Sequence, residues 1–164
     1  MALATALDWL GIGKRPARSA QEHSRLNFSS HLIPSLKGDH AELLKMYREV
    51  EKMAVEGRYA SIPAALAAFK SKFDLHILNE NMHFYCYIED KAEGRADSQE
   101  IIKGFRVEMN AIARGVVNFV KKYRMAGVRP SNGQEFLTEL RQVGVLLVAR
   151  IEREENELYT LYRP

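Results

Sequence analysis

Residues 61–90, SIPAALAAFKSKFDLHILNENMHFYCYIED, decide the fold. Apolar side chains recur in this stretch at alternating steps of four and three residues, the spacing that places them on one face of an α-helix. Ser61 is a suitable N-cap residue, and Pro63 fits the first turn, where a missing backbone N–H costs nothing. The stretch therefore predicts one long helix whose inward face is formed by Ile62, Leu66, Phe69, Phe73, His76, Glu80, His83 and Tyr87.

Three further stretches show the same helical spacing: residues 31–55, 97–125 and 132–162. The connections between the four contain glycine, and none alternates apolar and polar residues as a half-buried strand does. Four amphipathic helices with short connections predict an all-α, antiparallel, up-down-up-down four-helix bundle. We expect residues 31–164 to form this bundle and residues 1–30 to form an N-terminal arm and linker.

The composition is that of one ordinary globular domain. Of the 164 residues, 46% are apolar and 27% are charged, and the net charge is only +3. Acidic and basic residues are interleaved along the chain, so direct nucleic-acid binding is not predicted. Cys86 is the only cysteine, which excludes an intrachain disulfide and fits a reducing, cytoplasmic location. No pattern for a catalytic nucleophile, a phosphate loop or a dinucleotide site is present, so we expect a protein that is not an enzyme.

The first 19 residues place an apolar segment before a basic one, the reverse of a secretory signal. No apolar run approaches the roughly 18 residues that a membrane-spanning helix needs. The apolar segment either folds back on the bundle, which we favour, or docks on a partner or makes a weak peripheral contact with a membrane.

Polar residues interrupt the inward faces of the second and fourth predicted helices: His76, Glu80, His83, Arg150, Glu154 and Glu157. In an up-down bundle, the early part of the first and third helices is level with the late part of the other two. His40 and Met109 should therefore reach the same layer. Four helices thus converge on one polar layer inside the core.

Buried imidazoles and carboxylates are costly unless they bind an ion or one another. Two interpretations follow. In the first, the His and Glu side chains hold a transition metal, for which Fe, Mn and Zn are suited. In the second, the Arg150 guanidinium is the buried cation, and it pairs with Glu80 and Glu154 through directional hydrogen bonds.

The layer resembles that of the hemerythrin-like (HHE cation-binding) family of four-helix bundles. The matching residues are Asp39-His40 in the first helix, His76-x-x-x-Glu80 in the second and Glu154 in the fourth. In that family, one iron takes its imidazoles from the first and second helices, the other from the third and fourth, and two carboxylates bridge. The resemblance implies that one ion's ligand set is retained: His40, His76, Glu80 and Glu154, with His83 as an additional candidate.

Two departures from the family pattern affect the second ion. Met109 stands where the third helix has a histidine, and Arg150 occupies the histidine position of the fourth helix. A di-iron oxygen carrier is therefore not expected. From the sequence we favour a metal-free core in which Arg150 and Met109 replace the missing ligands, because a fixed positive charge beside the remaining site opposes cation binding. One Fe, Mn or Zn ion is the alternative.

These considerations predict a non-catalytic regulatory or interaction domain with a degenerate di-iron site, a protein partner and no cofactor. The first alternative is a mononuclear metal-binding or oxygen/redox-sensing domain. The second is a sigma-factor-binding transcription regulator, because residues 136–158 are similar to the matching helix of the Rsd/AlgQ anti-sigma regulators. Basic residues at the end of the third helix are candidates for an anionic-ligand site, although they also suit the helix dipole: Lys121, Lys122 and Arg124.

Overall fold

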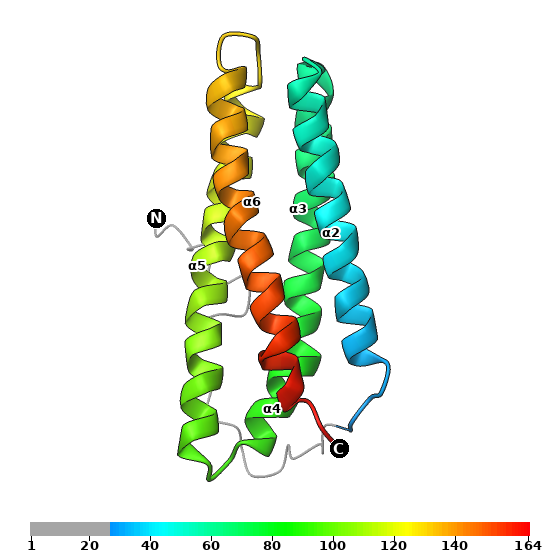
Figure 1. The fold of residues 1–164 in the computed structure, drawn as a ribbon, viewed down its shortest axis with the longest axis vertical. Helices are drawn as coiled ribbons and strands as arrows, with labels where there is room; N and C mark the ends of the chain where they lie inside the picture. Colours follow the sequence, from blue (N-terminus) through cyan, green and yellow to red (C-terminus); the bar gives the residue numbers. More distant parts are fainter. Residues whose placement is uncertain (1–26) are drawn as a thin grey trace, which may run out of the picture.

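The computed structural model describes residues 27–164. Four long helices lie side by side in Figure 1: α2 (Leu32–Val55), α3 (Ile62–Asn79), α5 (Ala96–Ala126) and α6 (Gly133–Asn156). Shorter helical segments complete the described chain, which contains no strand: η1 (Tyr59–Ser61), η2 (Glu80–Tyr85), α4 (Cys86–Lys91) and η3 (Leu158–Leu161). The all-α prediction is confirmed. The predicted arm falls almost entirely in residues 1–26, which lie outside the described residues.

Each long helix packs against two others. The contacts join α2 to α3 and α6, and they join α5 to α3 and α6. Figure 1 shows the chain rising in α2, descending in α3, rising in α5 and descending in α6. Short connections impose these alternating directions, because a chain that turns within a few residues must return beside the helix it has left.

The second helix is continuous from α3 through η2 to α4, but η2 is a π-helical segment. A π-helix bonds each residue to the fifth one along and so adds a residue to the turn. Beyond Glu80 the wider turn directs Phe84 and Tyr85 inward, and both are buried, as is the predicted Tyr87. His83 is exposed. The expectation that His83 faces the core was wrong for this reason.

The fourth helix also differs at its end. The fourth helix was predicted to reach residue 162 with Glu157 facing inward, but α6 ends at Asn156 and the tighter η3 follows. Glu157 is exposed, and Leu158 and Tyr159 are buried in its place. The change of turn therefore places a tyrosine, instead of a carboxylate, in the core at the end of the fourth helix.

Two apolar clusters form the core, and the polar layer lies between them. The helices α2 and α5 pass from one cluster to the other at this layer, whereas the core residues of α3 and α6 belong to one cluster and the other is reached in η2 and η3. On α2, for example, Leu36 belongs to one cluster and Leu43 to the other, and His40 lies between. On α5 the change falls between Phe105 and Met109. The predicted common level of the four helices is therefore present in the packing.

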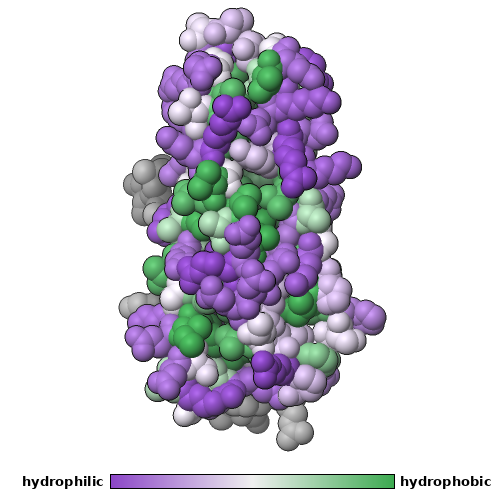
Figure 2. Space-filling view, in the orientation of Figure 1, coloured by the Kyte–Doolittle hydropathy of each residue, from purple (hydrophilic) through white to green (hydrophobic). Residues whose placement is uncertain are grey.

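The face of the molecule drawn in Figure 2 is mainly hydrophilic. Figure 2 shows charged and polar side chains over most of the face that α6 and α2 present, with apolar patches between them. Ile101 of α5 is 51% exposed, because its neighbour Ile102 takes the inward position. Of the helices within residues 27–164, none combines the length and the apolar character that crossing a bilayer requires.

Candidate metal centre

Five polar side chains of the layer are almost completely buried, and each is at most 3% exposed: His40, His76, Glu80, Arg150 and Glu154. They come from three separate elements of the bundle, α2, the α3–η2 helix and α6. The helical spacing places each of them on the inward face of its helix. His76 and Glu80 are one turn apart, as are Arg150 and Glu154, and buried apolar residues precede and follow each pair.

Three of these side chains direct one atom each toward a common point. His40 Nε2 lies 3.2 Å from His76 Nε2 and 3.2 Å from Glu154 Oε2. The three residues can offer ligand atoms that all lie within 4.8 Å of one another. An ion with bonds of roughly 2.0–2.2 Å to nitrogen and oxygen separates its ligands by about 3–3.5 Å in a tetrahedral site. The observed separations therefore suit one shared ion.

The outer nitrogens of the two histidines face carboxylates. His40 Nδ1 lies 2.9 Å from Glu155 Oε1, and His76 Nδ1 is 3.6 Å from Asp39 Oδ2, a longer contact. The hydrogen bond to Glu155 favours a proton on His40 Nδ1 and leaves its Nε2 free to act as a ligand. His76 Nδ1 is buried and has no hydrogen-bond partner among the described residues. Lys72 in turn holds Asp39, with its Nζ 2.7 Å from Oδ1. Glu155 thus orients the His40 imidazole, whereas Asp39 acts on His76 only as a nearby charge.

Glu80 lies beside this three-residue group, at the first position of the π-helical segment. Its Oε1 accepts a hydrogen bond from the Tyr159 hydroxyl at 3.2 Å. Its Oε2 is buried and has no hydrogen-bond partner among the described residues. A buried carboxylate oxygen without a partner is costly, so Glu80 is a fourth candidate ligand.

Arg150 occupies the other half of the layer. Its Nε donates to Glu154 Oε1 at 2.7 Å, and its two terminal nitrogens donate to the Tyr85 hydroxyl at 3.1 Å and to Glu108 Oε2 at 3.2 Å. The guanidinium also lies over the Phe105 ring, 4.8 Å from its centroid. Glu154 therefore shares its two oxygens between a fixed cation, Arg150, and the point between the histidines.

A small cavity of about 20 Å³ adjoins the converging atoms. Such a space holds about one water molecule. Its wall includes His40, His76, Arg150 and Glu154, and Met109 contributes from α5 together with apolar side chains. The third helix thus offers a thioether to this space.

The family model for the hemerythrin HHE cation binding domain matches residues 31–162. The chain belongs to this family. No curated protein and no solved structure matches it significantly, so the resemblance to the Rsd/AlgQ regulators stays a prediction. As a hemerythrin-like chain, it carries a candidate His/His/Glu metal site, whose Glu154 also pairs with Arg150.

In the hemerythrin-like layer, the pKa values of the titratable groups are shifted in different directions. Burial by itself would lower the pKa of His40, but hydrogen bonds to Glu154 and Glu155, with their charges, raise it above 6.5. Burial, reinforced by His40, lowers the pKa of His76 to about 4. Burial and then the Glu154 charge raise the pKa of Glu80 well above its usual value. Without an ion, protonation of His40 and Glu80 therefore offsets the negative charge of the carboxylates in the layer.

Glu154 behaves differently from Glu80. Burial favours its neutral form, yet the hydrogen bond to His40 and the charge of Arg150 outweigh burial and lower its pKa. Glu154 thus stays ionised between two positive groups, whereas Glu80 holds a proton that a cation would have to displace. These are the two carboxylates that the family pattern implied as bridges.

The structure separates the remaining candidates. His83 and Glu157 point away from the layer and are exposed. The predicted anionic-ligand group is also divided, because Lys122 pairs with Glu135 and Glu139 on α6, at 2.7 and 2.6 Å. The other two members line a hollow next to Val117 and Met125: Lys121 and Arg124.

Several residues of the centre were not identified from the sequence: Tyr85, Glu108, Glu155 and Tyr159. Glu155 and Tyr159 had a local signal, because each is close to Glu154 on the same helical run. Tyr85 had none, since only the π-helical segment turns it inward. Glu108 reaches Arg150 from α5, and that contact depends on how two helices pack.

Proposed function

We propose that this hemerythrin-like domain binds a single transition-metal ion through His40, His76 and Glu154, with Glu80 as a further ligand, and serves as a non-catalytic sensing or regulatory domain. The convergence of three buried acceptor atoms, two pairs of them 3.2 Å apart, carries the proposal. Lone pairs that face one another at this distance repel unless a cation or a proton lies between them.

Arg150 replaces the second ion of the family pattern in this proposal, and the first site stays available. It bonds to one oxygen of Glu154 and leaves the other directed at His40. The sequence by itself favours a core without any metal ion, in which Arg150 is the buried cation. The geometry supports a division instead, with an arginine in one half of the layer and an ion in the other.

The donor set consists of imidazole nitrogens and carboxylate oxygens, which suits Fe, Mn or Zn. When bound, such an ion would supply a position for a small ligand and, if it is redox-active, a change of charge. Glu155 holds the His40 imidazole in orientation, and the Tyr159 hydroxyl donates a hydrogen bond to one oxygen of Glu80. The apolar clusters on both sides exclude bulk water.

The small volume beside the site supports sensing in preference to catalysis on an organic substrate. About 20 Å³ accommodates a ligand of the size of water or a diatomic molecule. A change at the ion would be transmitted to Glu80, which begins the π-helical segment. Wide turns of this kind occur frequently at functional sites.

Metal content is the direct test. The full chain is purified without a metal-chelating tag, and bound metals are measured by elemental analysis for the wild type, His76→Ala and His83→Ala. We expect about one tightly bound ion per chain in the wild type and in His83→Ala, whose histidine is exposed on the same helix, and its loss in His76→Ala. A wild-type protein without a stoichiometric ion, even after addition of Fe, Mn or Zn, would contradict the proposal.

A metal-free regulatory domain is the second candidate. The raised pKa values of His40 and Glu80 support it, because protons on these two residues can offset the negative charge of the layer without an ion. The same measurement separates the two candidates. If no ion binds and the domain keeps its full stability in a chelator, the metal-free form is the working one.

A further inference from the structure

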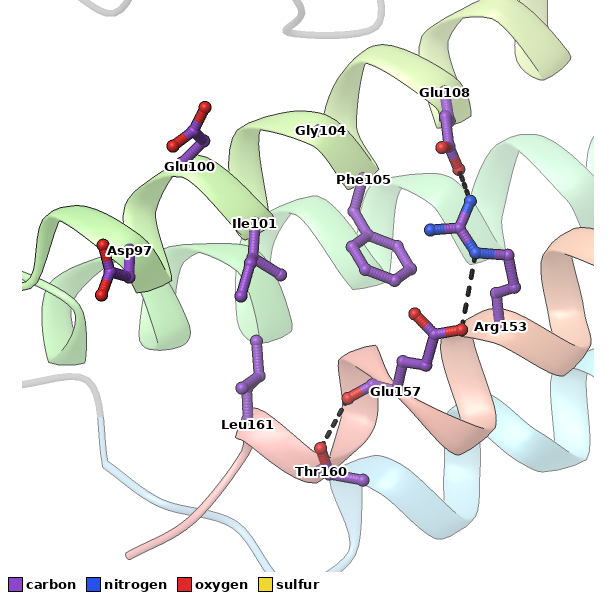
Figure 3. A pocket seen from close by; sticks show the side chains of 10 residues that line it. All are labelled: Asp97, Glu100, Ile101, Gly104, Phe105, Glu108, Arg153, Glu157, Thr160 and Leu161. Carbon is purple, nitrogen blue, oxygen red and sulfur yellow. Dashed lines mark hydrogen bonds and ion pairs between the residues drawn. The ribbon is translucent and has the colours of Figure 1, made fainter.

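A groove of about 710 Å³ crosses the surface between the first half of α5 and the end of the chain. Figure 3 shows its apolar side chains facing one another, with Ile101 and Phe105 from α5 and Leu161 from η3. Ile101 is 51% exposed, so the floor of the groove leaves a large apolar side chain in contact with solvent. A groove of this size and character is suited to an amphipathic segment.

The charges around the groove are unequal. At one end Arg153 pairs with Glu108 at 2.5 Å and with Glu157 at 3.6 Å (Figure 3). At the other end Asp97 and Glu100 lie on the first turns of α5, and within residues 27–164 no cationic side chain pairs with either. The groove therefore presents unneutralised negative charge next to its apolar floor.

The described chain starts beside this groove. Phe28 stacks on Tyr162, with ring centroids 5.0 Å apart, and the Ser29 backbone N–H donates to the Tyr162 hydroxyl at 2.9 Å. Tyr162 directly follows Leu161, which lines the groove. The 26 residues that precede the described part are therefore attached near one side of the groove, and the residues 19–26 alone can reach up to roughly 26 Å at about 3.3 Å per residue.

The chemistry of those residues complements the groove. Leu3, Leu7 and Leu10 are spaced by four and three, so a helical segment would place them on one face. Trp9 adds a large apolar surface. Three cations follow within five residues: Lys14, Arg15 and Arg18.

We propose that the chain's own N-terminal segment, residues 3–18, docks in the groove between α5 and η3. Its leucines and Trp9 cover Ile101, Phe105 and Leu161, and its cations lie beside Asp97 and Glu100. Tethering favours this occupant over a free partner, because a short linker raises the effective concentration of the segment at the groove.

Trp9 is the only tryptophan of the chain and reports on docking without a label. Its emission wavelength and its quenching by acrylamide are measured in the full-length protein, in the native state and in denaturant. We expect native Trp9 to emit at shorter wavelength and to be quenched less than in denaturant. High salt should weaken this protection, since the charges involved are exposed.

Two groove variants and one control locate the contact. Ile101→Glu and Glu100→Lys change exposed groove residues, and Val107→Glu changes a residue on the same helix that is 61% exposed and does not line the groove. We expect both groove variants to shift Trp9 emission to longer wavelength and to raise its quenching toward the denatured value, with an unchanged circular dichroism spectrum. Val107→Glu should match the wild type.

Three outcomes would overturn the proposal. The first is a wild-type Trp9 that is as accessible as in denaturant. The second is protection that survives in the groove variants, which would place the segment elsewhere. The third is protection that disappears on dilution together with a dimer seen in sedimentation, which would assign the groove to a second copy of the chain.

Discussion

Replacing Arg150 with methionine tests how the polar layer is stabilised. The substitution keeps an apolar stem in the same space but removes a cation that donates hydrogen bonds to Glu154, Tyr85 and Glu108. Glu108 keeps a second partner, Arg153. The Glu154 carboxylate and the Tyr85 hydroxyl then stay buried and lack the hydrogen bonds that Arg150 donates.

The magnitude follows from the burial of the pair. Arg150 and Glu154 are 3% and 1% exposed, and removing one partner of a buried ion pair costs roughly 3–5 kcal/mol. For a domain of this length, about 2–4 °C of melting temperature is lost per kcal/mol, so we expect a decrease of roughly 6–20 °C. The loss should shrink toward acidic pH. Arg150 lowers the pKa of Glu154, and this contribution to stability disappears as the carboxyl is protonated.

The assay is urea and thermal unfolding in a chelator, repeated with saturating metal. Arg141→Met is the matched control, because Arg141 forms an exposed ion pair with Glu51 at 2.7 Å, and such pairs contribute about 0–1 kcal/mol. With metal, Arg150→Met should recover more stability than the wild type gains, since a competing positive charge is gone. If Arg150→Met unfolds like Arg141→Met in the chelator, the argument for a stabilising buried arginine fails.

Three further predictions concern packing, the hydroxyl beside the site and protons. A Cβ at Gly144 would overlap the Tyr47 ring, whereas one at Gly115 meets nothing within 4 Å. Gly144→Ala should therefore destabilise the fold by about 1–3 kcal/mol, and Gly115→Ala should stabilise it by about 0.5–1 kcal/mol. Equal effects of the two substitutions in urea unfolding would contradict this packing. Tyr159→Phe removes the hydrogen bond to Glu80 and should cost about 1–2 kcal/mol in the chelator, and an unchanged melting temperature would show that the hydroxyl contributes nothing. Metal binding should release protons and strengthen as pH rises, because Glu80 has a raised pKa and must lose its proton to act as a ligand. Titration calorimetry in buffers of different ionisation enthalpy measures the proton release. A metal affinity that does not depend on pH would refute the prediction.

The helices and the level of the polar layer were predictable from the sequence. Helical periodicity is local, so residues 62, 66, 69 and 73 share a face whatever surrounds them. An up-down order then brings His40 of α2 level with His76 and Glu80 of the second helix and with Glu154 of α6. That much required only spacing, turn residues and the length of each helix.

Other features of the centre depend on tertiary packing. The π-helical turn at Glu80 moves the inward position from His83 to Phe84, and no spacing rule signals one added residue. The partners of Arg150 on other helices, Tyr85 and Glu108, are likewise set by how the helices rotate against one another.

The sequence by itself therefore determined a four-helix bundle with His, Glu and Arg in one buried layer, because apolar burial repeats with the helical period. Only the tertiary structure decided which atoms of that layer meet. It directs His40, His76 and one oxygen of Glu154 at a common point and gives the other oxygen to Arg150. Side-chain directions across helices depend on the contacts of all four helices together, and periodicity along one helix carries no information about them.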